Sequence, residues 1–331
     1  MLKAGPVKVS VLVPAYNEVE NVRRAYDAIV EVFERLPDHS YEIIFTDNHS
    51  NDGTFEILEA IALADKRVTV IRFSRNIGYQ RSLLVAYKAA TGDCSVQIDC
   101  DLQDPPHLIP DMLALWRQGN KVVYGVRKSL TDGPVTAMMR RLFYRLVNML
   151  SEDELPLNAG EFRLVDRKII DQLAKVEDTS PYLRGLISAM GFRQIAFEYD
   201  RRHRTAGTSK FPFKAMLALA VDGILNHSLV PLRLASITSL VVGATTLLAL
   251  VVYFAGWFIF GQSWPRGFAT TTILLLLSMT LNAMFLGILG EYVGRIFMQS
   301  KRRPMVVVEE SLNFEKRARP ARGRKANLES A

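Results

Sequence analysis

The chain has 331 residues, with 41 Lys and Arg against 34 Asp and Glu, and a net charge of +7 at pH 7. A pI near 9.4 with a positive mean hydropathy indicates a soluble part joined to a membrane segment rather than a soluble domain alone. Nucleic-acid binding would also account for a basic pI, but the charge lies next to the apolar segments and no stacking-rich motif accompanies it. We therefore expect no nucleic-acid partner.

The N-terminal half alternates short β-rich runs with helical patterns. This alternation is typical of an α/β fold, in which crossover helices connect the strands of a mostly parallel sheet. The predicted strands are Lys8–Val13, Glu42–Thr46, Val68–Phe73, Ser95–Ile98 and Lys121–Tyr124.

A polar cluster follows each of the first four predicted strands. In an open α/β sheet, ligands bind beyond the carboxyl ends of the strands, so we expect one crevice to hold all four clusters. The clusters are Tyr16-Asn17-Glu18, Asp47-Asn48-His49-Ser50, Ser74-Arg75-Asn76 and Asp99-Cys100-Asp101.

The segment VQIDCDLQDPPH, Val96 to His107, contains the most specific of these clusters. Alternation along an extended segment places Asp99 and Asp101 on one side. Two carboxylates and the amide of Gln103 suit a hard divalent cation, Mg²⁺ or Mn²⁺, which usually retains substrate phosphates as ligands. Taken alone, the pair is also compatible with a solvated turn.

Two common nucleotide-binding signatures are absent from the sequence, because no G-x-x-x-x-G-K-[ST] occurs and no G-x-G-x-x-G follows a strand. P-loop and hydride-transfer chemistry therefore lose support. The two cysteines, Cys94 and Cys100, are expected to be small buried side chains in a reducing compartment rather than a disulfide or a metal site.

Two uncharged segments, 234–260 and 268–289, are each long enough to cross a hydrocarbon core of about 30 Å. The connection Gly261–Gly267 is short, so the pair is predicted to be a membrane hairpin, with a buried core helix as the alternative. No signal peptide is evident at the N-terminus. Basic residues gather on the open side of the hairpin, which predicts that both termini face the cytoplasm: Arg233, Arg295, Lys301, Arg302 and Arg303, against Arg266 at the tip.

Motifs along the chain resemble, in order, those of family 2 glycosyltransferases of the GT-A fold, and specifically the polyprenyl-phosphate glycosyltransferases that include dolichol-phosphate mannose synthase and bactoprenol glucosyltransferase. As a set these motifs are highly specific. They are VSVLVPAYNE (Val9–Glu18), FTDNHSNDGT (Phe45–Thr54), FSRNIGYQRSLLVAYKAATGD (Phe73–Asp93), QIDCDLQDPP (Gln97–Pro106), VVYGVRK (Val122–Lys128), NAGEFRLVDRK (Asn158–Lys168) and RTAGTSKF (Arg204–Phe211).

The resemblance implies a nucleotide-sugar donor whose uracil and ribose are bordered by Pro14, Tyr16, Glu18 and Asp47, with Asp47 facing the base. It also implies that the metal bound to the Asp99 segment holds the diphosphate, with Asp101 in the catalytic role. The family often has a second acid where this chain has Asn48. Individually, Glu18 and Asp47 are also explained as helix caps or solvated turns.

The resemblance makes Arg204 and Lys210, on a basic loop that would close over the donor, the expected phosphate contacts of the nucleotide sugar. Glu161 matches a position where the family carries an acid, and we expect it to orient the acceptor or to take a residual proton, while Arg163 neutralises the incoming phosphate. A structural Glu161–Arg163 ion pair is equally open. A strong base is not required, because a phosphate monoester has its second pKa near ~6 and is mostly a dianion at pH 7.

Two amphipathic segments, Val135–Leu150 and Lys210–His227, carry apolar stripes with basic residues and are candidates for helices at the membrane surface. Ordinary core helices would give the same stripes. The predicted division of the chain is a cytoplasmic GT-A domain at 1–208, an amphipathic juxtamembrane helix at 209–231, two transmembrane helices within 232–295, and a basic cytoplasmic tail at 296–331.

The sequence thus predicts a metal-dependent hexosyltransferase of a bacterial inner membrane. It would transfer a sugar with inversion, with UDP-glucose as the leading donor, to undecaprenyl phosphate for envelope glycan modification. The alternatives are a non-catalytic membrane scaffold or lipid-moving component, and a membrane-anchored nucleotide hydrolase. A homo-oligomer is compatible with the sequence.

Overall fold

The computed structural model describes residues 6–127, 159–178, 181–200, 230–260, 267–301, 304 and 306–314. Within them, eight strands form one mixed sheet in the order β7-β5-β6-β4-β1-β2-β3-β8. The strands are β1 (Val7–Ala15), β2 (His39–Asp47), β3 (Val68–Phe73), β4 (Cys94–Gln97), β5 (Val122–Arg127), β6 (Ala159–Asp166), β7 (Gln194–Tyr199) and β8 (Val308–Leu312).

The sheet is mostly parallel, which confirms the predicted fold class. Strand β1 pairs in parallel with β2 and β4, β2 pairs in parallel with β3, and β5 pairs in parallel with β7. The antiparallel strands are β6, which lies between β4 and β5, and β8, which lies at the edge beside β3. All five strands predicted from the sequence are present, whereas β6, β7 and β8 were not predicted.

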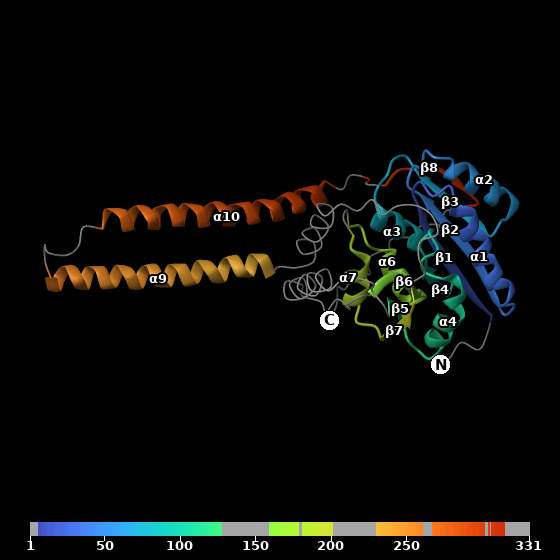
Figure 1. The fold of residues 1–331 in the computed structure, drawn as a ribbon, viewed down its shortest axis with the longest axis horizontal. Coiled ribbons are helices and arrows are strands. Elements are labelled where there is room, and N and C mark those ends of the chain that lie inside the picture. Colours follow the sequence, from blue (N-terminus) through green and yellow to red (C-terminus); the bar gives the residue numbers. More distant parts are fainter. Residues whose placement is uncertain are drawn as a thin grey trace, which may run out of the picture.

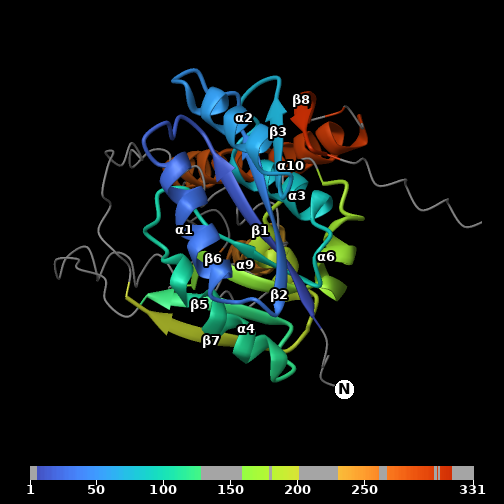
Figure 2. The ribbon, with the colours of Figure 1, turned by 90° about the vertical axis from the view of Figure 1, so that its right-hand side faces the viewer.

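Helices cover both faces of the sheet (Figure 2). On β1, Val9, Val11 and Val13 pack into one apolar cluster with helices α1, α2 and α4, and Leu12 packs into the other with α3, α6 and α7. Burial on both faces explains why this strand is a nearly continuous apolar run. The helices are α1 (Val22–Glu34), α2 (Thr54–Ala64), α3 (Tyr79–Ala89), α4 (Ile109–Arg117), α6 (Arg167–Leu173) and α7 (Leu183–Ala189), with a short 3₁₀ turn η1 (Pro106–Leu108) before α4.

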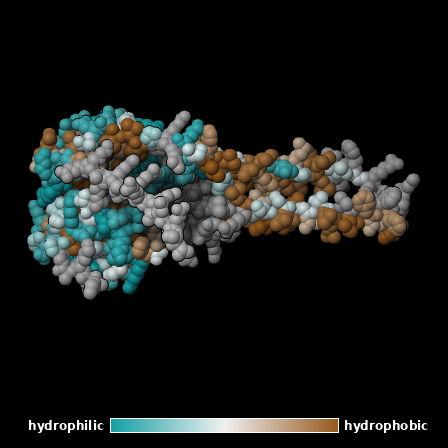
Figure 3. All heavy atoms as spheres, turned by 180° about the vertical axis from the view of Figure 1, so that it is seen from behind, coloured by the Kyte–Doolittle hydropathy of each residue, from teal (hydrophilic) through white to brown (hydrophobic). Residues whose placement is uncertain are grey.

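Two long helices, α9 (Val230–Phe260) and α10 (Phe268–Ser300), lie side by side and project from the sheet domain (Figure 1). Their surface is largely apolar (Figure 3). Both contain candidate membrane spans by length and composition, Leu234–Gly256 and Leu274–Ser300, and most of the described side chains in them are exposed. Helix α10 continues well beyond residue 289, where the predicted span ends, and its last turns carry a 2.8 Å Arg295–Glu291 ion pair.

Residues 308–312 of the predicted basic tail, 296–331, form strand β8 of the sheet, while the predicted division of the chain into domains stays a prediction. Strand β8 pairs with β3, Leu312 opposite Val70, and the side chain of Asn313 donates to the carbonyls of Ala62 and Val68 at 2.6 and 2.9 Å. This strand was not predicted because its sequence, VEESL, is short and acidic and does not alternate apolar with polar residues. The start of α9 and the end of α10 both lie near the sheet domain (Figure 1).

Cys94 and Cys100 are buried, as predicted, and they form no disulfide with each other. The amphipathic segments Val135–Leu150 and Lys210–His227, together with Arg204, lie outside the described residues.

Candidate functional site

The predicted polar clusters meet at one edge of the sheet. In the strand register, Ala15 lies opposite Asp47 and Asp47 opposite Arg72, so β1, β2 and β3 end at the same level. Strand β4 reaches that level as well, because Leu12 pairs with Gln97 and the next residues are Ile98 and Asp99. The edge therefore gathers the side chains that the sequence placed in one crevice.

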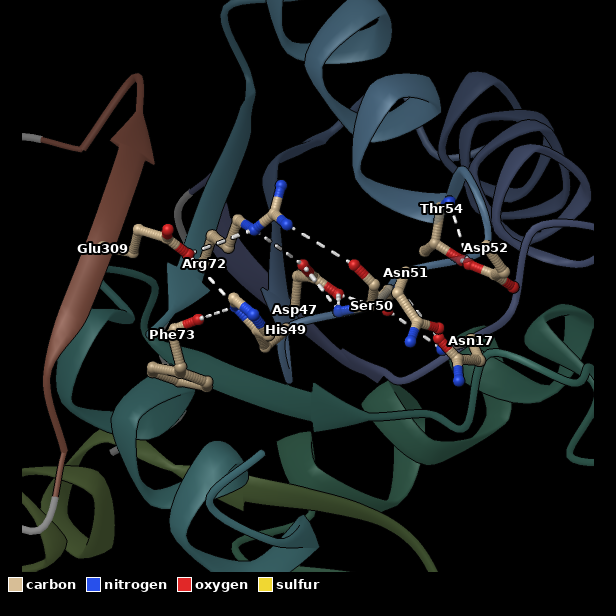
Figure 4. Close-up of polar contacts among 10 residues, drawn as sticks. All are labelled: Asn17, Asp47, His49, Ser50, Asn51, Asp52, Thr54, Arg72, Phe73 and Glu309. Carbon is tan, nitrogen blue, oxygen red and sulfur yellow. Dashed lines mark hydrogen bonds and ion pairs between the residues drawn. The ribbon is translucent and has the colours of Figure 1, made fainter. Parts of the chain in front are cut away.

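The turn after β2 is held from inside by Asp47 (Figure 4). This carboxylate is fully buried and accepts from the Ser50 hydroxyl at 2.5 Å and from the Ser50 backbone N–H at 3.1 Å. Burial raises the pKa of Asp47, and the Ser50 hydrogen bonds and the charge of Arg72 only partly oppose that effect. As placed, Asp47 shapes the turn and its carboxylate is closed off, so its predicted contact with a base stays a prediction.

The turn after β1 is locked to the turn after β2. Asn17 has a φ of +55°, its backbone N–H donates to the Ser50 hydroxyl at 2.9 Å, and its side chain accepts from the N–H of Asn51 at 3.0 Å. Tyr16 is 48% exposed beside this lock, whereas Pro14 is buried. Of the predicted nucleotide border, Tyr16 is thus the exposed residue, and Asn17 beside it is exposed as well.

Glu18 makes the contacts of a residue at a helix start, which was the alternative interpretation of its role. Its side chain accepts from Asn21 at 2.6 Å and its carbonyl accepts the N–H groups of Asn21 and Val22 at the start of α1. Its own N–H donates to the Thr54 hydroxyl at 2.8 Å, which ties α1 to α2. These contacts account for Glu18 without a ligand, and its role in donor binding stays a prediction.

The D-x-D segment leaves β4 in a tight turn. Asp101 is 7% exposed and accepts from the N–H of Gln103 at 3.1 Å, across Leu102 with a φ of +55°. Asp99 accepts from the Tyr79 hydroxyl at 2.7 Å. Burial raises the pKa of Asp99 to about 7, with a further contribution from the neighbouring negative charges, Asp104 first among them.

This donor set fits a divalent cation that shares its ligands with a substrate. Within the described ranges, no three His, Cys, Asp or Glu side chains are arranged to hold a metal ion by themselves. Asp99 and Asp101 offer hard carboxylate oxygens, and Gln103 offers an amide oxygen from the same turn. Mg²⁺ is commonly bound in this way, through one or two carboxylates and substrate phosphates, and Mn²⁺ suits the same oxygen donors.

Glu161 lies beyond the D-x-D segment, on β6, and is held by two arginines. Its carboxylate is 2.8 Å from the Arg184 guanidinium and 3.8 Å from that of Arg163, with 23% of its side chain exposed. Burial by itself would raise the pKa of Glu161, but the charges of Arg163 and Arg184 and the hydrogen bonds from Gln97 and Arg184 lower it. The predicted Glu161–Arg163 pair therefore exists, with Arg184 as the closer partner.

A continuous chain of hydrogen bonds joins these two centres. The Gln97 amide donates to Glu161 at 3.2 Å and to the Tyr79 hydroxyl at 3.0 Å, and Tyr79 donates in turn to Asp99. Burial raises the pKa of Tyr79 well above its ordinary value, so its hydroxyl stays a donor. The order along the chain is Asp99, Tyr79, Gln97, Glu161.

Tyr79, Gln97 and Arg184 were not among the predicted site residues. Tyr79 and Gln97 lie inside recognisable motifs, Phe73–Asp93 and Gln97–Pro106, so the signal for them was present in the sequence. Nothing local distinguishes Arg184, which reaches Glu161 only because α7 packs beside the sheet.

Comparisons with known proteins identify the family of the chain. Residues 10–174 match the model for Glycosyl transferase family 2. The uncharacterised glycosyltransferase YkcC of Bacillus subtilis (strain 168) is 37% identical over 312 residues, which are 93% of this chain and 95% of the relative. The chain belongs to glycosyl transferase family 2.

This glycosyltransferase has further relatives along nearly its whole length. The prophage bactoprenol glucosyl transferase homolog of Escherichia coli (strain K12) is 32% identical over 304 residues, covering 92% of this chain and 99% of that protein. Among solved structures, the mannosyltransferase PcManGT from Pyrobaculum calidifontis, in complex with GDP-Man and Mn²⁺, has a TM-score of 0.43 and 19% identity over 88% of both chains. The matched length of the relatives includes the two apolar helices as well as the sheet domain.

Proposed function

We propose that this glycosyltransferase moves a sugar, with inversion, from a nucleoside-diphosphate sugar to polyprenyl phosphate, with UDP-glucose as the leading donor and undecaprenyl phosphate as the acceptor. The observation that carries the proposal is the hydrogen-bonded chain from Asp99 to Glu161. It places an acidic centre suited to a metal-bound diphosphate next to an arginine-rich centre suited to an anionic acceptor. The name of the Escherichia coli relative, a bactoprenol glucosyl transferase homolog, supports the same reaction.

On the donor side, the turns after β1 and β2 would receive the nucleoside, with Tyr16 and Asn17 accessible and Asp47 fixing the turn from below. Asp99, Asp101 and Gln103 would hold Mg²⁺ or Mn²⁺, which would stabilise the negative charge of the departing diphosphate. The buried acids repel one another without a cation, and this favours binding of one. Arg204 and Lys210 remain proposed phosphate contacts.

On the acceptor side, the dianionic phosphate needs positioning and charge compensation more than deprotonation. The lowered pKa of Glu161 makes it a weak base at neutral pH, so its contribution would be to orient Arg184 and Arg163 toward the acceptor. Arg163 itself is almost fully buried. Arg184, whose side chain is 18% exposed, is the more accessible of the two cations.

The apolar helices α9 and α10 would place this site at the bilayer where a polyprenyl phosphate lies. We propose a bacterial inner-membrane location with the sheet domain and both termini cytoplasmic. The basic residues flanking the helices support that orientation, and so does the return of the chain to the sheet domain as β8.

The alternative is a non-catalytic scaffold or lipid-moving component. It would have no need to keep Asp99, Asp101 and Asp104 close together, because such an arrangement raises the pKa of Asp99 and disfavours its charged form. The site therefore favours the enzyme.

A donor panel tests the proposal. The detergent-purified full chain is given labelled UDP-glucose, UDP-galactose, UDP-N-acetyl sugars and GDP-mannose with undecaprenyl phosphate, in Mg²⁺, in Mn²⁺ and with chelator. We expect one sugar, UDP-glucose first, to enter the lipid fraction only when a divalent cation is present. Nucleotide binding without transfer of any sugar would favour the scaffold, and transfer undiminished by chelator would contradict the metal assignment.

A further inference from the structure

Strand β8 brings an acidic side chain to the edge of the nucleotide half of the site (Figure 4). Glu309 comes from the segment that follows α10, yet its carboxylate lies 3.1 Å from Nδ1 of His49 and 3.4 Å from Nε of Arg72. His49 lies in the turn that follows Asp47, and Arg72 lies opposite Asp47 at the end of β3. A residue more than 200 positions away in the sequence thus contacts the proposed nucleotide-binding turn.

Arg72 lies between two carboxylates. Its Nε is 3.7 Å from the buried Asp47 and 3.4 Å from Glu309. This Nε atom is buried and has no hydrogen-bond partner among the described residues. Its guanidinium stacks 4.3 Å over the ring of Phe55 and donates to the Ser50 carbonyl at 3.4 Å. Arg72, with only 21% of its side chain exposed, is thus held by these two acids together with Phe55 and Ser50.

His49 is the second point of contact. It has a φ of +62°, a conformation that a non-glycine residue keeps only when surrounding contacts hold it. Those contacts are the Phe73 carbonyl at 3.1 Å and Glu309 at 3.1 Å. The turn from Asp47 to Asn51 is therefore held by the Asp47–Ser50 hydrogen bonds on one side and by Glu309 of β8 on the other.

We propose that Glu309 is a positioning residue for the donor nucleotide: it fixes Arg72 and His49, and through them the turn that receives the nucleoside diphosphate, so that donor affinity depends on the segment that follows the apolar helices. The inference rests on the proposed function in one respect, that this turn binds the nucleotide. It also gives a reason for the chain to return to the sheet after α10. Two helices that served only to attach the protein to a membrane would not need a following strand beside β3.

The matched variants are Glu309→Gln and Glu310→Gln in the full chain. Glu310 lies opposite Arg72 in the strand register, beside a bulge, but among the described residues only Glu309 forms the ion pairs with His49 and Arg72, so Glu310→Gln loses the same charge without those contacts. Because the contacts of Glu309 are charge-assisted but partly exposed, we expect Glu309→Gln to weaken UDP binding and raise the KM for the donor by roughly 5- to 20-fold. The kcat, the KM for undecaprenyl phosphate and the melting temperature without nucleotide should stay near wild type, as should every value for Glu310→Gln.

A combined variant separates positioning of the turn from simple attachment of β8 to the sheet. If Glu309 acts through Arg72 and His49, then Glu309→Gln added to the pair Arg72→Gln and His49→Asn should bind UDP no more weakly than that pair alone. Additive losses would overturn the inference, and so would unchanged UDP affinity in Glu309→Gln, or an equal loss in Glu310→Gln. Should Glu309→Gln fail to fold, Arg72→Lys tests the same contact with the β8 sequence intact, and wild-type UDP affinity in that variant would overturn the inference.

Direct measurement of UDP binding by calorimetry keeps this test apart from that of the overall reaction. A wild-type chain that binds UDP but transfers no sugar would contradict the proposed function alone. A wild-type chain that transfers sugar while Glu309→Gln binds UDP equally well would contradict the role of Glu309 alone.

Discussion

Replacing Asp101 with Asn is expected to lower sugar transfer by roughly 100-fold or more, with the loss mainly in kcat and little change in folding. Asp101 is nearly buried at the carboxyl edge of the sheet and its side chain caps the turn to Gln103, so an amide of the same size preserves the packing. What the amide removes is a negative charge from the proposed cation site. The measurement is the initial rate with saturating donor across a titration of Mg²⁺ or Mn²⁺.

The matched control is Asp111→Asn. Asp111 is an exposed acid in the first turn of α4, so this variant removes the same charge at a position away from the site. It should keep wild-type rates and metal dependence. Retained activity in Asp101→Asn, with the same metal dependence as the wild type, would remove Asp101 from the metal site.

Replacing Glu161 with Gln should lower kcat/KM for the lipid acceptor by roughly 10- to 100-fold while leaving the KM for the donor nearly unchanged. The neutral side chain leaves Arg184 and Arg163 without their shared counter-ion, so the acceptor phosphate meets misdirected cations. The measurement is transfer at varied undecaprenyl phosphate, repeated across pH 6 to 9 in about half-unit steps.

The pH profile distinguishes the two roles predicted for Glu161. Burial would raise its pKa, but the arginines and hydrogen bonds lower it below its ordinary value, so the carboxylate is ionised throughout this range. A positioning role predicts a profile of the same shape in wild type and Glu161→Gln. An acidic limb that disappears in the variant would instead identify Glu161 as the proton acceptor. The exposed residue Glu198 on β7 provides the control, Glu198→Gln, which should match the wild type.

Strands β1 to β5 were predictable because their signals are local, whereas β7, which pairs in parallel with β5, was missed. Strands such as Val68–Phe73 are buried on both faces and appear in the sequence as short apolar runs between turns. The antiparallel strands lack such a signal. Strand β6 contains Glu161 and Arg163, which are tolerated only because they pair with each other and with Arg184, and β8 is acidic because it lies at an exposed edge beside Arg72.

The candidate site divides in the same way. Asp99, Asp101 and Glu161 were identified from their motifs, and the structure brings Asp99 and Glu161 into one hydrogen-bonded chain. Arg184 and Glu309 were missed, because each reaches the site from an element whose position depends on tertiary packing rather than on neighbouring sequence. Asp47 was identified too, and the structure shows its carboxylate hydrogen-bonded to Ser50, so its contact with a base stays a prediction.

The most direct test of the central claim is mass spectrometry of the lipid formed from UDP-glucose and undecaprenyl phosphate by the purified chain with a divalent cation. The account predicts an undecaprenyl lipid that carries one hexose and one phosphate, formed in equal amount with released UDP. Two phosphates on the lipid would mean transfer of a sugar phosphate, and free glucose in the aqueous phase would mean hydrolysis. Either result would contradict glycosyl transfer to polyprenyl phosphate.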